Sequence, residues 1–472
     1  MTRATLRQWV SLGGLLLALS GCSSLPTIVP DLARRPSTPV LLEGARGPLS
    51  AARSKAVLDR LRGRGVATDI FERHLAVEEE ISGSPLTAGN DVLLLQDGPA
   101  TYRAMFAAIA SAQDHINMET YILEDDEIGQ RFAQALIDKQ SQGVQVNLIR
   151  DSVGTLGTPA AFFTRLQDAG VKVLEFNPLN PLTAMSARKE WELNQRDHRK
   201  LLIVDGRTAF LGGINISSVY SGGSFSRGSR GSGQPTADKP EGDPAWRDTD
   251  VQLRGPVVAE FQKLFMATWA KQQGEPLAPK NYFPVPENVG RHVVRAIGSS
   301  PDEPFSQIYA TLLSAIGSAE TSVSITNAYF VPDPQLLAAL ESAARRGVDV
   351  RLILPSRTDS WLVFHAGRRF YSQLLRAGVK IFERRGVILH SKTALVDGVW
   401  ATVGSTNLDW RSFLHNQELN AVVLGPEFGR QVQAMFDKDL AASDAVDLAQ
   451  WERRPFEMRV KEQFARAWEY WL

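Results

Sequence analysis

Residues 198–206 read HRKLLIVDG and residues 390–398 read HSKTALVDG, so one short pattern occurs twice in this chain. Each copy is followed by a second run that is similar in the two copies, LGGIN at 211–215 and VGSTN at 403–407. The intervals between His, Lys, Asp, Gly and Asn are the same in both copies. A full repeat at a separation of 192 residues (390 minus 198) indicates two related halves and not a chance match.

The start of each pattern pairs an imidazole with an ammonium group. A β-strand sends alternate side chains to one face, so His198 projects beside Lys200, and His390 projects beside Lys392. The apolar residues that follow suit a buried strand. Each copy therefore presents one His and one Lys together at the beginning of a strand.

An Asp-Gly pair ends each of these strands. Asp-Gly before a second apolar run is a strong hairpin signal, which gives Asp205 and Asp397 a structural role first. The returning strands lead to Asn215 and Asn407, each preceded by two small residues that allow a backbone to approach a ligand closely. We therefore expect two hairpins whose open ends, opposite the Asp-Gly turns, meet a common ligand.

The double pattern resembles the signature of the phospholipase D superfamily, HxKxxxxD followed by GGxN or GSxN. The resemblance implies phosphodiester exchange through a covalent phosphohistidine, with His198 as nucleophile and His390 as general acid and then general base. It implies no cofactor, and no metal is expected because Lys is not a ligand and no HxH or paired-Cys spacing occurs. The implied catalytic residues are His198, Lys200, Asp205, His390, Lys392 and Asp397, and the implied phosphate-binding residues are Asn215, Ser405 and Asn407.

A carboxylate follows each motif at a matching place. Counting back seven residues from the Gly-Pro pairs at 255–256 and 425–426 reaches Asp248 and Glu418. We expect these two acids to hold the histidine ring nitrogens that face away from phosphorus, which fixes tautomer and orientation. The alternative is a pair of surface strand residues.

Strand and helix patterns alternate on both sides of the middle of the chain. Residues 143–149 recur at 347–353, and residues 169–175 recur at 377–383. This alternation predicts an α/β fold. The superfamily resemblance implies two similar phospholipase D-like halves, each a central mixed sheet flanked by helices, related by pseudo-twofold symmetry.

Composition divides the chain into six expected segments. These are a signal peptide at 1–22, a Pro-rich tether at 23–48, a helical segment at 49–88, a first repeat at 89–285, a second repeat at 286–445 and a helical tail at 446–472. The first repeat contains a Ser/Gly/Pro-rich insertion at 221–242, which we expect to be mobile.

The N-terminus has the features of a bacterial export signal. Arg3 and Arg7 precede an apolar core at 12–19, too short for the roughly 20 apolar residues that span a bilayer. The four residues ending at Cys22 resemble a lipoprotein cleavage box, which implies lipidation of Cys22, with a plain signal peptide or an uncleaved anchor as alternatives. Ser23 after the cysteine favours the outer membrane over the inner one. We expect a lipid-anchored protein facing the periplasm.

The charge balance disfavours a polyanionic partner. Lys plus Arg equals Asp plus Glu, 52 of each, whereas a nucleic-acid binder usually has a basic excess. We therefore expect no nucleic-acid partner, and a superfamily nuclease is disfavoured. The single cysteine excludes an internal disulfide.

Several further segments resemble bacterial cardiolipin synthases. They are NQRDHRK at 194–200, YFVP at 329–332, RRGVDV at 345–350 and GSTNLDWRSF at 404–413, within a resemblance that covers roughly residues 90–440. It implies transfer of a phosphatidyl group from one phosphatidylglycerol to another with release of glycerol. The alternatives are a lipid-anchored phospholipase D that hydrolyses or uses another alcohol, and a lipid-binding lipoprotein without turnover.

The C-terminal segment at 451–472 mixes basic and aromatic residues. This composition suits a helix resting at an anionic membrane surface. An ordinary helix that packs against the fold is the alternative.

Overall fold

The computed structural model describes residues 39–62, 68–179, 194–222 and 245–468. The expected signal peptide with Cys22, most of the expected tether and nearly all of the insertion lie outside the described residues. Among the described residues, no helix combines the length and apolar character that crossing a membrane requires.

The first half is built on a mixed sheet in the order β6–β5–β4–β8–β9–β11–β3. The outer strands β4, β5 and β6 are parallel, and the hairpin β8–β9 carries the first repeated motif. The strands are β3 (Leu86–Leu95), β4 (His115–Thr120), β5 (Gln145–Asp151), β6 (Lys172–Phe176), β8 (Leu201–Val204), β9 (Thr208–Gly212) and β11 (Asp250–Arg254).

The second half repeats this order as β15–β14–β13–β17–β18–β19–β12. Strand β3 pairs antiparallel with β12, so the two sheets join where the pseudo-twofold axis passes. The strands are β12 (His292–Ser299), β13 (Ser322–Asn327), β14 (Asp349–Pro355), β15 (Lys380–Arg384), β17 (Lys392–Val396), β18 (Trp400–Gly404) and β19 (Asn416–Leu424), with β20 (Ser443–Ala445) added at the β15 edge.

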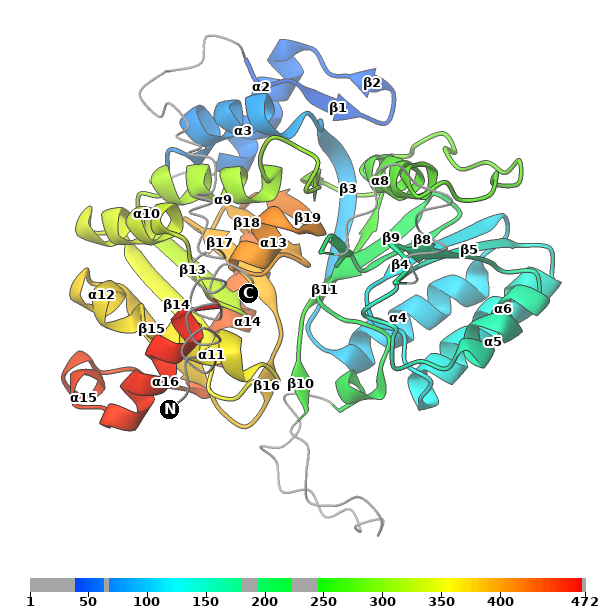
Figure 1. Ribbon diagram of the computed structural model, residues 1–472. Coiled ribbons are helices and arrows are strands. Elements are labelled where there is room, and N and C mark those ends of the chain that lie inside the picture. Colours follow the sequence, from blue (N-terminus) through cyan, green and yellow to red (C-terminus); the bar gives the residue numbers. More distant parts are fainter. Residues whose placement is uncertain (1–38, 63–67, 180–193, 223–244, 469–472) are drawn as a thin grey trace, which may run out of the picture.

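Helices cover both sheets, and Figure 1 shows the two halves side by side with β3 between them. Several helices begin at a side chain that caps them, such as Asp97, Asp126 and Asp333, each of which accepts a hydrogen bond from a backbone N–H of the first turn. The first half has α4 (Gly98–Ser111), α5 (Glu127–Ser141), α6 (Ala160–Asp168) and α8 (Val258–Lys271); the second has α9 (Gln307–Gly317), α10 (Pro334–Arg345), α11 (Trp361–Arg368), α12 (Tyr371–Arg376), α13 (Trp410–Leu414), α14 (Pro426–Ala441), α15 (Leu448–Glu452) and α16 (Phe456–Arg466).

One buried cluster belongs to both halves. It brings Leu211 and Val251 of the first half together with Val403 and Ala421 of the second, and α8 and α14 contribute to it. Burial of this shared apolar surface holds the two sheets together. The predicted α/β fold with two similar halves is therefore confirmed.

The structure differs from the sequence-based expectation near the N-terminus. Residues at the end of the expected tether form the strands β1 (Leu42–Gly44) and β2 (Gly47–Pro48), and β1 pairs with β3. The segment that follows contains α2 (Ala51–Arg62), the π-helix η1 (Ile70–His74) and α3 (Leu75–Ser82). Hydrogen bonding of β1 to β2 and β3 thus gives this end of the Pro-rich segment a regular structure that its composition does not predict.

Candidate active site

Two short parallel bridges connect the halves beside the repeated motifs. In the first, β7 (Arg196–Asp197) pairs with the start of β19, and in the second, β10 (Trp246–Arg247) pairs with β16 (Ile388–Leu389). Each bridge ends one residue before a histidine on one strand and one residue before a carboxylate on the other. Register therefore sets His198 opposite Glu418, and His390 opposite Asp248.

The two histidine–carboxylate pairs are crossed between the halves. His198 Nδ1 lies 3.1 Å from each carboxylate oxygen of Glu418, and His390 Nδ1 lies 2.7 Å from Asp248 Oδ2. The backbone N–H groups of the histidines donate across the same bridges, over 3.0 Å to Gln417 O and 2.7 Å to Arg247 O. With Nδ1 held by a carboxylate, Nε2 is the ring nitrogen that can face a substrate.

Both lysines of the motifs are buried beside these histidines. Lys200 Nζ donates to the carbonyl of His198 over 2.6 Å, and Lys392 Nζ lies 2.9 Å from His390 Nδ1. Burial and, to a smaller extent, the charge of Lys392 lower the pKa of Lys200 to about 7, against the opposing effect of the Glu418 carboxylate. Burial also lowers the pKa of Lys392. Two ammonium groups in one desolvated site favour binding of an anion such as a phosphodiester.

The two histidines differ in their electrostatic surroundings. Burial lowers the pKa of His198 well below its usual value, and the charges of Lys200, Lys392 and His390 lower it further. Burial and Lys392 also lower the pKa of His390, but the carboxylate of Asp248 raises it. His390 therefore holds a proton more readily than His198. The mutual influence of these groups places both histidines in one site.

Aromatic side chains surround the two imidazoles. The Tyr121 ring lies edge-on to His198 with centroids 5.1 Å apart, and Tyr329 lies edge-on to His390 at 5.9 Å. Trp246 lies 5.0 Å from the His390 ring, and the hydroxyl of Tyr220 lies 3.3 Å from His390 Nδ1. The sequence interpretation did not select Tyr220 or Trp246, because both lie beside the insertion and neither belongs to the repeated pattern.

The three residues expected to bind phosphate lie in different settings. The Ser405 hydroxyl donates to the Glu418 carboxylate, which in turn contacts His198. The phosphate-binding role expected of Ser405 stays a prediction. Asn215 donates to the Tyr220 hydroxyl over 3.1 Å and accepts from the backbone of Ile122. Asn407 is buried, and its Oδ1 has no hydrogen-bond partner among the described residues. This Oδ1 atom is an acceptor and fits a donor group of a ligand, whereas the Nδ2 group of the same side chain is the part that can donate to a phosphate oxygen.

Asp205 and Asp397 lie away from the histidines, in the hairpin turns. Both have positive φ, 54° and 50°, which suits the Asp-Gly turn. Asp205 accepts backbone hydrogen bonds from residues 113–115, and Asp397 accepts them from residues 320–322. Four residues lie between each aspartate and the lysine of its motif, a separation of roughly 16 Å along an extended chain. The structure thus gives both aspartates the turn role inferred from Asp-Gly, and their grouping with the catalytic residues stays a prediction.

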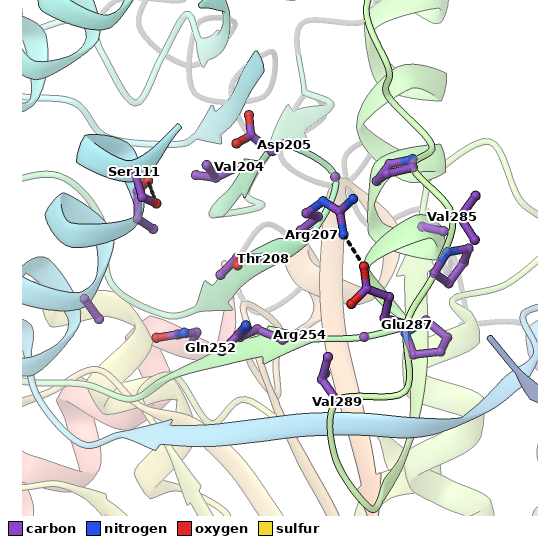
Figure 2. Close-up of a pocket in the computed structure, with 18 of the residues that line it drawn as sticks. Ser111, Val204, Asp205, Arg207, Thr208, Gln252, Arg254, Val285, Glu287 and Val289 are labelled. Carbon is purple, nitrogen blue, oxygen red and sulfur yellow. Dashed lines mark hydrogen bonds and ion pairs between the residues drawn. The ribbon is translucent and has the colours of Figure 1, made fainter. Parts of the chain in front are cut away.

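The same end of the first hairpin borders a surface cavity of about 420 Å³ (Figure 2). Asp205, Arg207 and Val289 are among its lining residues, and Arg207 forms an ion pair with Glu287 there. None of the paired histidines or carboxylates lines it. This cavity is therefore separate from the histidine site.

Known proteins resemble this chain in sequence and in fold. The chain matches the family described as "Cardiolipin synthase, PLD-like domain" at residues 105–221 and 312–440. It is 35% identical over 395 residues to a cardiolipin synthase of Geobacillus thermodenitrificans, covering 83% of this chain and 74% of that protein. It is 37% identical over 362 residues to cardiolipin synthase A of Pseudomonas entomophila, covering 75% and 69%. The crystal structure of phosphatidylserine synthase from Haemophilus influenzae has the same fold, with a TM-score of 0.58 and 14% identity over 84% of this chain and 99% of that one. The chain belongs to the cardiolipin synthase PLD-like family of the phospholipase D superfamily.

Proposed function

We propose that this protein is a phosphatidyltransferase that makes cardiolipin and glycerol from two molecules of phosphatidylglycerol. The observation that carries the proposal is the pair of buried histidines, each held at Nδ1 by a carboxylate of the other half. This arrangement leaves two Nε2 atoms and two ammonium groups for one phosphodiester. The names of the relatives supply the substrate class.

In the first step, Nε2 of His198 attacks phosphorus and the bond from phosphorus to the glycerol oxygen breaks. His390 gives its proton to that oxygen, so glycerol leaves neutral and a phosphatidyl-histidine remains. The lower pKa of His198 favours the neutral nucleophile, and Asp248 favours the protonated acid at His390. Lys200 and Lys392 stabilise charge on the nonbridging oxygens, with Asn407 as a further donor.

In the second step, neutral His390 takes the proton from a hydroxyl of a second phosphatidylglycerol. That oxygen attacks phosphorus, the bond to His198 breaks, and cardiolipin is released. The aromatic side chains around the imidazoles, and the small exposure of His198 and His390 (7% and 5%), limit the access of water to the intermediate. This burial supports transfer to an alcohol over hydrolysis.

The test is product analysis with the purified full-length protein and phosphatidylglycerol in detergent micelles. We expect cardiolipin and glycerol in equal amounts. Phosphatidic acid alone would establish hydrolysis instead, and no product from a folded protein would favour a lipid-binding role. The His198→Ala variant is the control, because it should fold and form no product.

The proposal includes a lipid anchor at Cys22 that faces the periplasm, with the outer membrane favoured. Its support is the short apolar core before Cys22 and the serine after it. Incorporation of labelled palmitate into the wild-type chain, lost in Cys22→Ser, is the expected result. A wild-type chain without acyl label would contradict the anchor.

A further inference from the structure

Helix α16 has two different faces. One face is buried: Ala465 belongs to the core of the second half, Glu462 is nearly inaccessible, and the helix packs against α11. On the outward face, apolar residues recur every four positions, which places them in one stripe. They are Phe456, Val460 and Phe464 on the helix, followed by Trp468 in the turn after its last residue, with 80%, 49%, 60% and 47% of their surface exposed.

Basic residues border this stripe. Arg459 and Arg466 are exposed on one side of it, and Lys461, paired with Glu457, lies on the other. Helix geometry of 3.6 residues per turn puts these cations between the stripe and the buried face. Long basic side chains at this position can keep their charge at an anionic surface while the aromatic side chains enter it. The charge pattern therefore selects a lipid surface as the partner.

The stripe continues towards the site through Trp361 at the start of α11. Trp361 is 46% exposed, and its ring centroid lies 6.2 Å from that of Phe464. Two residues earlier, Asp359 accepts hydrogen bonds of 2.7 and 2.6 Å from the Tyr329 hydroxyl, and Tyr329 packs against His390. Figure 1 shows α11 and α16 side by side, where the two helices are in contact.

From this geometry we propose that Trp361, Phe456, Val460, Phe464 and Trp468 form a membrane-docking surface, called here the interfacial patch, that rests on an anionic bilayer beside the active site. The location beside His390 matters because a phosphatidyl substrate keeps its acyl chains in the bilayer while its phosphate reaches the site, and this reason rests on the proposed function. The burial and charge pattern of α16 do not depend on it.

A single fluorescent label tests the interfacial patch. Cys22 is the only cysteine of the chain, so Cys22→Ser gives a background that accepts one label and removes any acyl anchor. Val460→Cys places the label in the patch. Val285→Cys is the matched control, because Val285 is 79% exposed and lines the cavity at the far end of the first hairpin. An environment-sensitive fluorophore at each position is then titrated with vesicles of phosphatidylserine and phosphatidylcholine.

We expect the label at 460 to shift to shorter wavelength and to be quenched by brominated acyl chains, and the label at 285 to stay in water. Equal responses at both positions, or none at 460, would overturn the proposal. A shift at 460 that needs no vesicles and grows with protein concentration would also overturn it, by identifying the stripe as a surface for a second copy.

A double variant, Phe456→Ser with Phe464→Ser, links the patch to turnover. Both side chains are exposed, so the fold should persist, and binding to the same vesicles should fall about tenfold or more. Activity on a short-chain phosphatidylglycerol dispersed as monomers should stay at the wild-type level. The vesicles contain no phosphatidylglycerol, so insertion and turnover are measured separately. Insertion of the 460 label together with no turnover of the short-chain phosphatidylglycerol would contradict only the proposed function. Turnover of that substrate together with a label at 460 that stays in water would contradict only the patch.

Discussion

The two halves share a strand order but differ in the ionisable side chains that are buried near their motifs. Strand register matches residues of the first half with residues of the second at four positions near the histidines. In the first half these residues are ionisable and in the second they are neutral. The matched residues are Glu119 and Thr326, Asp197 and Leu389, Arg199 and Ser391, and Asp250 and Asn420.

This difference separates what the fold requires from what the site requires. Burial raises the pKa of Glu119 and of Asp250 well above the usual range, and the neighbouring Asp197 and Asp248 raise them further. Buried ionisable groups rarely stabilise a fold. Since the second half has the same strands without these groups, they are not needed for the architecture. The inequality of the two histidines has other sources: in addition to burial, Lys200, Lys392 and His390 lower the pKa of His198, whereas Asp248 raises that of His390.

The largest expected difference between the two halves appears when glycerol is replaced as the leaving group by nitrophenolate and the His198→Ala and His390→Ala variants are compared. With phosphatidylglycerol, His198→Ala and His390→Ala should each lose about 10³-fold or more in kcat. A p-nitrophenyl phosphatidyl ester needs no general acid, because nitrophenolate leaves unprotonated. We therefore expect His390→Ala to release a burst of nitrophenolate and accumulate phosphatidyl-histidine, seen by intact mass, and His198→Ala to do neither.

The reverse pattern, a burst in His198→Ala and none in His390→Ala, would exchange the two roles. Circular dichroism of both variants is the control, because each histidine is buried and its loss could affect folding. Equal bursts would mean that either histidine can act as nucleophile.

The small residues before each asparagine give a second contrast. A Cβ atom at Gly213 would lie 2.2 Å from Asp248 Oδ1, whereas Ser405 at the matched position donates to Glu418. Gly213→Ser should displace Asp248 from His390 and lower kcat about 100-fold. Ser405→Gly removes one hydrogen bond and should lower kcat less than tenfold.

A double variant sharpens this prediction. Gly213→Ser combined with Asp248→Glu recreates in the first half the Ser and Glu of the second, so it should recover part of the activity that Gly213→Ser loses. If Gly213→Ser alone had wild-type activity, contact between the serine and Asp248 would not matter for catalysis.

The pH dependence of kcat/KM gives the third contrast. We expect a bell with its optimum below pH 6.5, because burial lowers the pKa of both histidines. The rising limb follows loss of the proton from His198, and the falling limb follows loss of the proton from His390. Asp248 raises the pKa of His390, so Asp248→Asn should move the falling limb to lower pH by about one unit. Glu418→Gln is the matched variant and should leave the falling limb in place; a shift of that limb would contradict the assignment.

Much of this site could be predicted from repetition alone. The repeated motif located both histidines and lysines, and the distance to each Gly-Pro pair located Asp248 and Glu418. The crossing of the pairs could not be predicted, because it depends on the bridges β7–β19 and β10–β16, where only two residues pair on each strand. Asp248 also lies between β10 and β11 and not on a strand.

Side-chain contacts explain the remaining differences. Tyr121 and Tyr329 fall at similar places in the sequence, but register matches Tyr329 with Ile122, so the two tyrosines reach their histidines from different positions. The hydrogen bond from Ser405 to Glu418 joins the residue after β18 to a residue of β19, and the motif does not encode the pairing of these two strands. Local pattern thus identifies which residues matter, and pairing between segments decides what each one contacts.

The smallest effect on catalysis is expected at the two turn aspartates, where stability should change instead. Asp397 accepts hydrogen bonds from the Thr68 and Thr321 side chains in addition to backbone N–H groups. Within the part of the chain that the structure describes, Asp205 accepts from backbone N–H groups alone. Hydrogen bonds to a charged acceptor contribute about 1.5–3 kcal/mol each and do not add fully. Asp397→Ala should therefore lower the free energy of unfolding by about 1 kcal/mol more than Asp205→Ala, as measured by urea denaturation.

The corresponding Asp→Asn variants separate the hydrogen bonds from the turn geometry, because Asn tolerates positive φ almost as well as Asp while Ala does not. Each Asn variant should keep the hairpin and lose less stability than its Ala counterpart. In all four variants kcat per folded molecule should remain near that of the wild type, since the turns lie roughly 16 Å along the strand from the lysines. A variant that keeps its stability and loses kcat would show that its aspartate takes part in catalysis. A loss of kcat at only one of the two aspartates would show that the halves differ in their turns as well as in their buried ionisable groups.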